Sequence, residues 1–135
     1  MAVTWLDGGI DYKANLFMKR TAEQDLTVRL YTNNLAPLVT HTAANFTECT
    51  LAGYAPVTLT PANWVGGTAG GVATYTYPTL TFTFNPYAGG VTVFGYFVTI
   101  PGVIGVSAEL FSVPYVVPAG GGSLTLDNTF TDRKL

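Results

Sequence analysis

The chain has 135 residues, which is enough for one domain with a single hydrophobic core and no disulfide or metal staples. Only 10% of the residues are charged, against about 25% in a typical soluble domain, and the formal net charge is −2. This composition argues against a nucleic-acid partner, because phosphate binding needs a basic patch, and it predicts an unusually neutral surface.

The sequence also argues against secretion and a membrane span. Cys49 is the one cysteine and cannot form an internal disulfide, and residues 1–7 lack the basic start and apolar core of a signal peptide. Glycines and prolines interrupt the apolar region 91–117, so no helix of about 20 unbroken apolar residues can be drawn there. We therefore expect synthesis in a reducing cytoplasm and no membrane partner.

Residues 1–22 are predicted to form an N-terminal arm and a short helix, ahead of a β domain at 23–135. The arm contains Trp5 and Leu6. Two interpretations remain open: the arm packs on the chain's own core, or it docks on a neighbouring subunit.

The helix is expected from Tyr12 to about Lys19. Asp11 is suited to cap it, because its carboxylate accepts hydrogen bonds from backbone donors at a helix start. Its apolar stripe would consist of Ile10, Ala14 and Phe17.

A strict alternation of apolar and polar residues begins at Leu26 and predicts a strand over 26–31. Residues 35–45 follow as a loop. Short strands are expected at 46–51 and 56–59.

Residues 61–71 are predicted to be a loop with Trp64 as an anchor and two glycine pairs as flexible joints. A strand is expected at 72–77, and Pro78 then marks an edge or a bend.

The stretch 79–100 is predicted to be a β-hairpin, with 85–90 as the reversal between two strands. The first strand has one apolar face. The second is apolar on both faces, with Val93 and Phe97 on one side and Phe94 and Tyr96 on the other. It is therefore expected to be a central strand with a layer on each side.

Further strands are expected at 103–111 and 124–131, with a short extended piece at 114–118. About seven or eight short strands with turn signals between them predict an all-β fold, an antiparallel β-sandwich of jelly-roll type.

Residue chemistry does not indicate catalysis, a cofactor or a metal site. His41 lies in a polar loop without a nearby nucleophile in the sequence, and Cys49 has no basic neighbour that would lower its pKa. Glu48 and Glu109 are the acids of the middle of the chain and could form a glycosidase pair if they met, but structural carboxylates are commoner. The glycosylation sequon at Asn45 has no secretory signal to accompany it.

Several apolar and aromatic residues are candidates for an interface or for stacking on sugars, although core packing explains such residues more simply. The interface candidates are Trp5, Leu6, Trp64, Tyr75, Tyr77 and Tyr87.

A series of short segments matches a known pattern in order and spacing: 29–34 with Pro37, then 46–48, 53–55, Leu59, Trp64, 93–98 and 109–111. The pattern resembles a family of short proteins encoded by tailed bacteriophages, over roughly residues 26–131. The chain departs from it at Cys49, where a small residue is more usual, and in its N-terminal arm.

The resemblance implies a non-enzymatic virion structural protein, plausibly a capsid decoration or cement protein. Such a protein would assemble in the host cytoplasm, bind the major capsid protein between capsomers on the capsid surface, and form a homo-oligomer, expected to be a homotrimer. The alternative is a tail-fibre or receptor-binding tip, or a carbohydrate-binding module, with Trp64 and Tyr87 stacking on sugars.

Overall fold

The computed structural model of the chain describes residues 3–17, 24–127 and 129–133. The described part is mostly β-structure, and its strand pairs are antiparallel, as the sequence predicts. Its elements are β1 (Thr4–Trp5), α1 (Asp7–Phe17), β2 (Leu26–Tyr31), η1 (Ala43–Asn45), β3 (Val57–Leu59), η2 (Pro61–Asn63), β4 (Val65–Ala69), β5 (Val72–Thr76), β6 (Leu80–Phe84), β7 (Thr92–Ile100), β8 (Ile104–Val116), β9 (Gly122–Leu126) and β10 (Thr129–Arg133). None of the helices in these ranges has the length and apolar character needed to cross a membrane.

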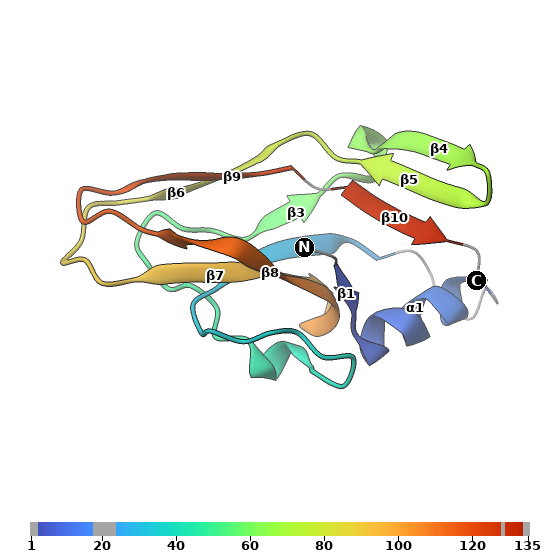
Figure 1. Cartoon of the computed structure of the whole chain (residues 1–135), viewed down its shortest axis with the longest axis horizontal. Coiled ribbons are helices and arrows are strands. Elements are labelled where there is room, and N and C mark those ends of the chain that lie inside the picture. Colours follow the sequence, from blue (N-terminus) through green and yellow to red (C-terminus); the bar gives the residue numbers. More distant parts are fainter. Residues whose placement is uncertain (1–2, 18–23, 128, 134–135) are drawn as a thin grey trace.

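The larger sheet has five strands in the order β1-β8-β7-β2-β3 (Figure 1). β7 lies between β8 and β2, which confirms the predicted central position of 91–100. β3 pairs only with the first half of β2. Beyond it, Tyr54 Oη accepts the N–H of Leu30, and the Leu30 carbonyl accepts the N–H of Cys49. The edge of β2 is thereby satisfied without a longer strand.

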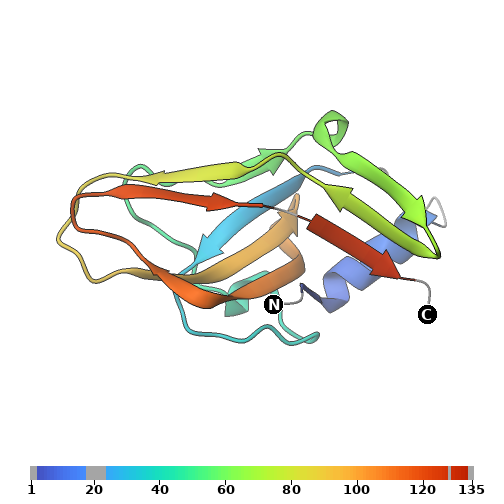
Figure 2. The same ribbon diagram turned by 45° about the horizontal axis from the view of Figure 1, so that its top comes forward.

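The other strands form a long two-stranded ribbon with one additional strand. β6 pairs with β9, and β5 pairs with β10, so β5 leads into β6 while β9 leads into β10 (Figure 2). Residues 77–79 join β5 to β6 outside both of these pairings, and Pro78 among them interrupts the ribbon. β4 pairs with the other edge of β5.

The predicted hairpin of 79–100 is wrong. β6 pairs with β9 and β7 pairs with β8 and β2, so the two halves of this stretch belong to different sheets. Residues 85–91 therefore cross between the layers. Residues 85–90 do reverse the chain direction, as their composition predicts. Gly89 and Gly90, both at positive φ, direct the chain into the neighbouring layer.

A second connection, from β8 to β9, runs beside this crossing at the same end of the molecule (Figure 1). Tyr87 fastens the two together. Its backbone N–H donates to the Ala119 carbonyl at 2.8 Å, and its hydroxyl donates to the Val117 carbonyl at 2.7 Å while accepting the Val91 N–H at 3.1 Å.

Each face of the five-stranded sheet has its own hydrophobic cluster. The main core lies between the sheet and the ribbon and joins Val28, Leu30 and Val98 to Phe82 and Phe84. The second cluster, on the opposite face, consists of Leu6, Tyr31, Phe46, Phe97 and Ala108 and is covered partly by the loop after β2.

The two apolar faces of β7 are confirmed, but two residues were assigned to the wrong side. Val93 belongs to the main core together with Tyr96, and Phe94 packs on the second cluster with Phe97. A β-bulge between Val93 and Gly95 shifts the alternation by one residue, which a strict period of two does not anticipate.

Gly95 is required at this bulge by a close approach. The Tyr31 ring crosses it, so that a Cβ built on Gly95 would lie 2.6 Å from Tyr31 Oη. The crossing brings Tyr31 Oη to the Leu35 carbonyl, to which it donates at 3.0 Å.

The described part of the N-terminal segment packs on the chain's own core. β1 pairs with β8, and Leu6 is fully buried. Helix α1 begins at Asp7, earlier than the predicted Tyr12, and the prediction for residues 18–19 lies outside the described residues. Ile10 is 48% exposed, so it does not form the predicted buried stripe.

The early helix start depends on Gly8 and Gly9, which sequence reasoning takes as helix breakers. A Cβ built on Gly9 would lie 2.0 Å from the Val106 carbonyl oxygen, so the glycine lets the first helical turn press directly on β8.

Two further corrections concern the middle of the chain. Within 46–51 the described structure has an isolated bridge between Glu48 and Tyr31 in place of the predicted strand. The backbone groups of Leu30 pair with the Tyr54 hydroxyl and the Cys49 N–H, so a longer strand is not needed there. The predicted loop 61–71 contains β4. Gly70 and Gly71, with φ of 59° and 78°, form the two-residue turn of a β4–β5 hairpin.

Replacing Gly9 by Ala tests the close approach of α1. We expect Gly9→Ala to lower the free energy of unfolding by roughly 1–3 kcal/mol, although Ala favours a helix interior by about 1 kcal/mol, because the added methyl group overlaps the β8 backbone. Gly67→Ala is the matched control, since a Cβ there meets nothing within 4 Å. Urea unfolding measures both, and a Gly9→Ala protein as stable as the Gly67→Ala protein would contradict the packing described for α1.

Buried tyrosines predict the response of the fold to alkaline pH. Burial, with a smaller contribution from the nearby Glu109 charge, raises the pKa of Tyr31 to about 12. Burial likewise raises the pKa of Tyr96, next to Glu109, and of Tyr54, next to Glu48. The folded state therefore holds these protons more tightly than the unfolded chain, whose tyrosines titrate near pH 10.

We expect full stability below about pH 10 and a progressive loss from pH 10 to 12, approaching about 1.4 kcal/mol per pH unit for each tyrosine that ionises only on unfolding. Urea midpoints at pH 8, 10 and 11.5 measure this loss. Tyr96→Phe should make the decline shallower. A free energy of unfolding that stays constant from pH 9.5 to 11.5 would show that these hydroxyls are not held protonated by the fold.

Candidate functional sites: an aromatic pocket and an exposed strand edge

Glu48 has structural partners beside β2. Arg29 Nη1 donates to both of its carboxylate oxygens at 3.1 Å, and Tyr54 Oη donates to Oε1 at 3.0 Å. Arg29 Nε also donates to Thr99 Oγ1 at 3.0 Å. The Glu48 carboxylate therefore pairs with the Arg29 guanidinium and positions it on the sheet.

Glu109 lies on the other side of two strands. It stands opposite Tyr96 on β7, whose hydroxyl donates to Glu109 Oε2 at 2.9 Å, whereas Glu48 stands opposite Tyr31 on the far edge of β2. The sheet register therefore separates the two carboxylates by β7 and β2. The arrangement does not bring them together across a common cleft, as glycoside hydrolysis would require.

The remaining reactive side chains are also engaged locally. His41 Nδ1 accepts the Leu38 N–H at 3.1 Å, and its ring meets the edge of Phe46. Cys49 is buried in the main core, and burial raises the pKa of its thiol. Within the described residues, His, Cys, Asp and Glu side chains do not gather in groups of three or more.

Three of the six interface candidates have roles inside the chain. Leu6 is fully buried, and Tyr77 is 7% exposed with its hydroxyl accepting the Thr60 N–H at 2.8 Å. Hydrogen bonding from Thr60 lowers the pKa of Tyr77. Tyr87 fastens the crossing loops, at the opposite end of the molecule from Trp64, so the two do not form the expected sugar-stacking pair.

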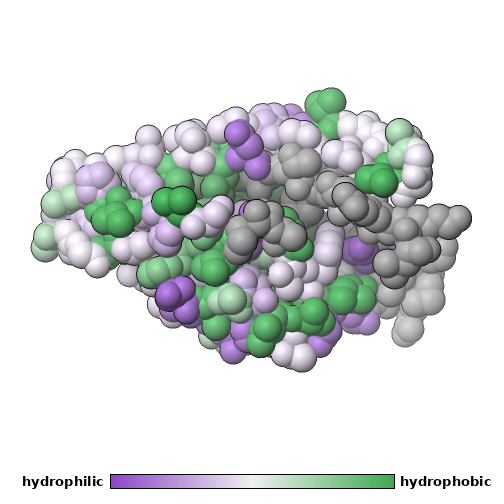
Figure 3. Space-filling view, viewed as in Figure 1, coloured by the Kyte–Doolittle hydropathy of each residue, from purple (hydrophilic) through white to green (hydrophobic). Residues whose placement is uncertain are grey.

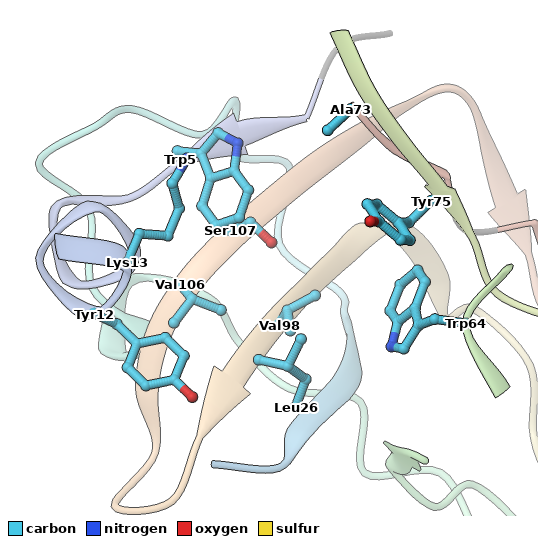
Figure 4. Close-up of a pocket in the computed structure, with 10 residues that line it drawn as sticks. All are labelled: Trp5, Tyr12, Lys13, Leu26, Trp64, Ala73, Tyr75, Val98, Val106 and Ser107. Atoms are coloured by element: carbon cyan, nitrogen blue, oxygen red, sulfur yellow. The ribbon is translucent and has the colours of Figure 1, made fainter. Parts of the chain in front are cut away.

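The other three candidates meet at one pocket. Trp5 from β1, Trp64 from the turn before β4 and Tyr75 from β5 surround a hollow between the five-stranded sheet and the β4–β5 hairpin (Figure 4). The hollow has a volume of about 380 Å³. Its other described lining residues are Tyr12, Lys13, Leu26, Ala73, Val98, Val106 and Ser107.

Packing fixes the aromatic walls of this pocket. Lys13 Nζ lies 4.3 Å from the centre of the Trp5 ring, a cation–π contact that joins α1 to β1. Trp64 meets Tyr77 edge to face at 5.0 Å, and Tyr12 Oη accepts the Gln24 N–H at 2.7 Å. The described lining of the pocket therefore comes from seven separate segments of the chain, which the tertiary fold brings together.

Ser107 is the polar residue in the floor of the pocket. It stands between Val98 on β7 and Trp5 on β1, and its hydroxyl points into the hollow (Figure 4). The residue is 0% exposed, and its Oγ is the one buried side-chain oxygen or nitrogen among the described residues that has no hydrogen-bond partner. A buried hydroxyl without a partner costs roughly 1–3 kcal/mol, so this atom is an unusual feature.

The free edge of β4 is a second candidate site. All of Val65–Ala69 is exposed, Val65 to 73%, and neither β4 nor β5 has a charged residue or a proline. Ala69 and Val72 flank the two-residue turn and form a hydrogen-bonded pair, so the alternation along the strands directs the N–H and C=O of Thr68 to the free edge. Natural proteins usually protect such edges with charges, prolines or bulges.

Comparison of the chain with protein-family models, with curated proteins and with solved structures gives no match.

Sequence reasoning named three aromatic residues of the pocket but missed Ser107 and the β4 edge. The Gly70-Gly71 pair between alternating residues is the signal that could have indicated the β4–β5 hairpin. Ser107 had no such signal, because its lack of a partner depends on segments that are distant in the sequence and meet only in the fold.

Removing the Ser107 hydroxyl tests whether it lacks a partner. We expect Ser107→Ala to leave the free energy of unfolding unchanged or to raise it by up to about 1 kcal/mol, because no hydrogen bond is lost. Thr99→Val also removes a buried hydroxyl, but one that accepts from Arg29 Nε, and it should cost roughly 1–2 kcal/mol. Urea unfolding measures both variants. If Ser107→Ala lowers the free energy of unfolding by more than about 1 kcal/mol, the Ser107 hydroxyl has a hydrogen-bond partner in solution.

Proposed function

We propose that the chain is a non-enzymatic structural protein of a tailed-bacteriophage virion, a capsid decoration protein that binds the major capsid protein between capsomers. The sequence resemblance suggests the class, and the exposed β4 edge is the observation that favours a docking role. An unprotected strand edge in a soluble protein invites pairing with another strand.

The surface chemistry favours docking through a neutral contact surface over electrostatic attraction of a charged partner. Residues 49–108 contain no acidic or basic residue, and the described part of the face in Figure 3 is a mixture of pale and hydrophobic residues with scattered hydrophilic ones. The outer side of the ribbon presents Thr81, Thr83 and Thr125, all exposed. Such a face loses little hydration free energy when another protein covers it.

The two layers, one a five-stranded sheet and the other the ribbon with β4, would act as a rigid β-sandwich in this role. In a homotrimer each contact between subunits is made three times, so a small apolar patch contributes three times to the binding free energy of the trimer. Val113 and Val116 on β8 are 81% and 65% exposed, and they are our choice for the contact between subunits.

The alternative is recognition of a host surface polysaccharide by a tail tip. The crossing-loop end of the molecule does not favour it, because the Tyr87 hydroxyl is occupied by Val117 and Val91. Sugar binding also needs several hydrogen-bonding groups in the site, and the aromatic pocket between the layers is largely apolar in its described lining.

The β4 edge can be blocked without altering the hydrogen bonds inside the sheet. Thr68→Pro removes an N–H that points outward and introduces a ring that prevents strand addition, and Thr68→Ala is the matched control. We expect wild-type and Thr68→Ala proteins to co-sediment with undecorated phage heads, and Thr68→Pro to lose at least tenfold in affinity while remaining folded.

Circular dichroism and native mass separate failed binding from failed folding. If the wild-type protein does not bind the heads but binds host polysaccharide, the result would contradict the decoration role and favour the recognition role. Thr68→Pro protein that binds the heads as tightly as wild type would place the contact away from β4.

A further inference from the structure

We propose that the pocket between the two layers binds a small, largely apolar aromatic molecule carrying one hydroxyl group, which pairs with Ser107 Oγ. This role is separate from docking on a capsid, because the pocket faces the interior between the sheets and the β4 edge faces outward.

The size and lining of the hollow set the class of ligand. A volume of about 380 Å³ falls in the range of small-molecule sites and exceeds what one benzene ring needs. Trp5 supplies an aromatic surface on one side of the hollow, Trp64 and Tyr75 supply two on the other, and Val98 and Val106 supply an aliphatic floor between them (Figure 4). A flat ring would therefore meet ring faces and edges on several sides, which favours an aromatic ligand over a flexible chain.

The single hydroxyl of the ligand follows from Ser107. The residue is 0% exposed and its Oγ has no partner among the described protein groups, so a group that enters the hollow can pair with it. One hydroxyl on the ligand can donate to or accept from Ser107. A sugar, with a hydroxyl on nearly every carbon, would leave most of its polar groups unpaired against valine and indole.

The positive charge of Lys13 does not make an anion the favoured ligand of the pocket. Its ammonium group lies over the Trp5 ring at 4.3 Å, and its packing there belongs to the wall of the pocket. The described lining is largely apolar, which does not favour a carboxylate or a phosphate drawn into the space between the layers.

The test uses two probes of nearly equal shape, 4-methylphenol and 1,4-dimethylbenzene, titrated into the isotopically labelled full-length chain and followed by amide chemical shifts. We expect saturable binding of both, with shifts centred on Val98, Ser107 and Tyr75. The phenol should bind roughly threefold to tenfold more tightly, because it alone forms the hydrogen bond.

Variants assign the effect to this pocket. Ser107→Ala should abolish the preference for the phenol while leaving binding of dimethylbenzene unchanged. Ala73→Phe fills the hollow from β5 and should abolish binding of both probes, whereas Thr74→Phe, which places the same ring on the opposite, exposed side of β5, should not.

Three results would overturn the proposal. They are an absence of saturable binding by the folded wild-type chain, binding that survives Ala73→Phe in a folded variant, and a preference for the phenol that survives Ser107→Ala.

Discussion

Burial of both faces of β7 is the constraint on which the rest of the structure depends. Tyr96 and Val98 face the ribbon while Phe97 faces the second cluster, and all three are nearly or fully buried. Burying a large apolar side chain contributes about 1.5–3 kcal/mol, so exposing either face would remove a large part of the 5–15 kcal/mol typical of a domain. A layer is therefore needed on each side, and the ribbon on one side and Leu6 with the β2–η1 loop on the other supply it.

Local patterns in the sequence were sufficient for much of the fold. The alternation at 26–31 and 80–84 identified β2 and β6, the strand expected at 72–77 corresponds to β5, and the doubly apolar stretch identified the central strand. Periodicity does not say which strands pair, so β6 was joined to β7 when its partner is β9, far along the chain. Glycines gave two further errors, the late helix start and the missed strand β4, because a glycine that permits close packing or a hairpin turn looks the same in sequence as one in a loop.

The same neutral composition leads to both candidate sites. A chain without charges between Glu48 and Glu109 cannot protect the β4 edge with lysine or glutamate, and it lines the space between its layers with rings and valines. Trp5, Trp64 and Tyr75 were predictable as notable residues from their type. Their meeting at Ser107 was not, because Trp5 reaches Ser107 through the β1–β8 pairing, which joins residues about 100 positions apart in the chain.

The position of the chain in a density map of the intact virion tests whether it is a decoration subunit docked through its exposed strand edge. We expect density for the chain on the capsid surface between capsomers, with β4 against the major capsid protein. Density at the tail tip, or a capsid position in which β4 faces solvent, would contradict it.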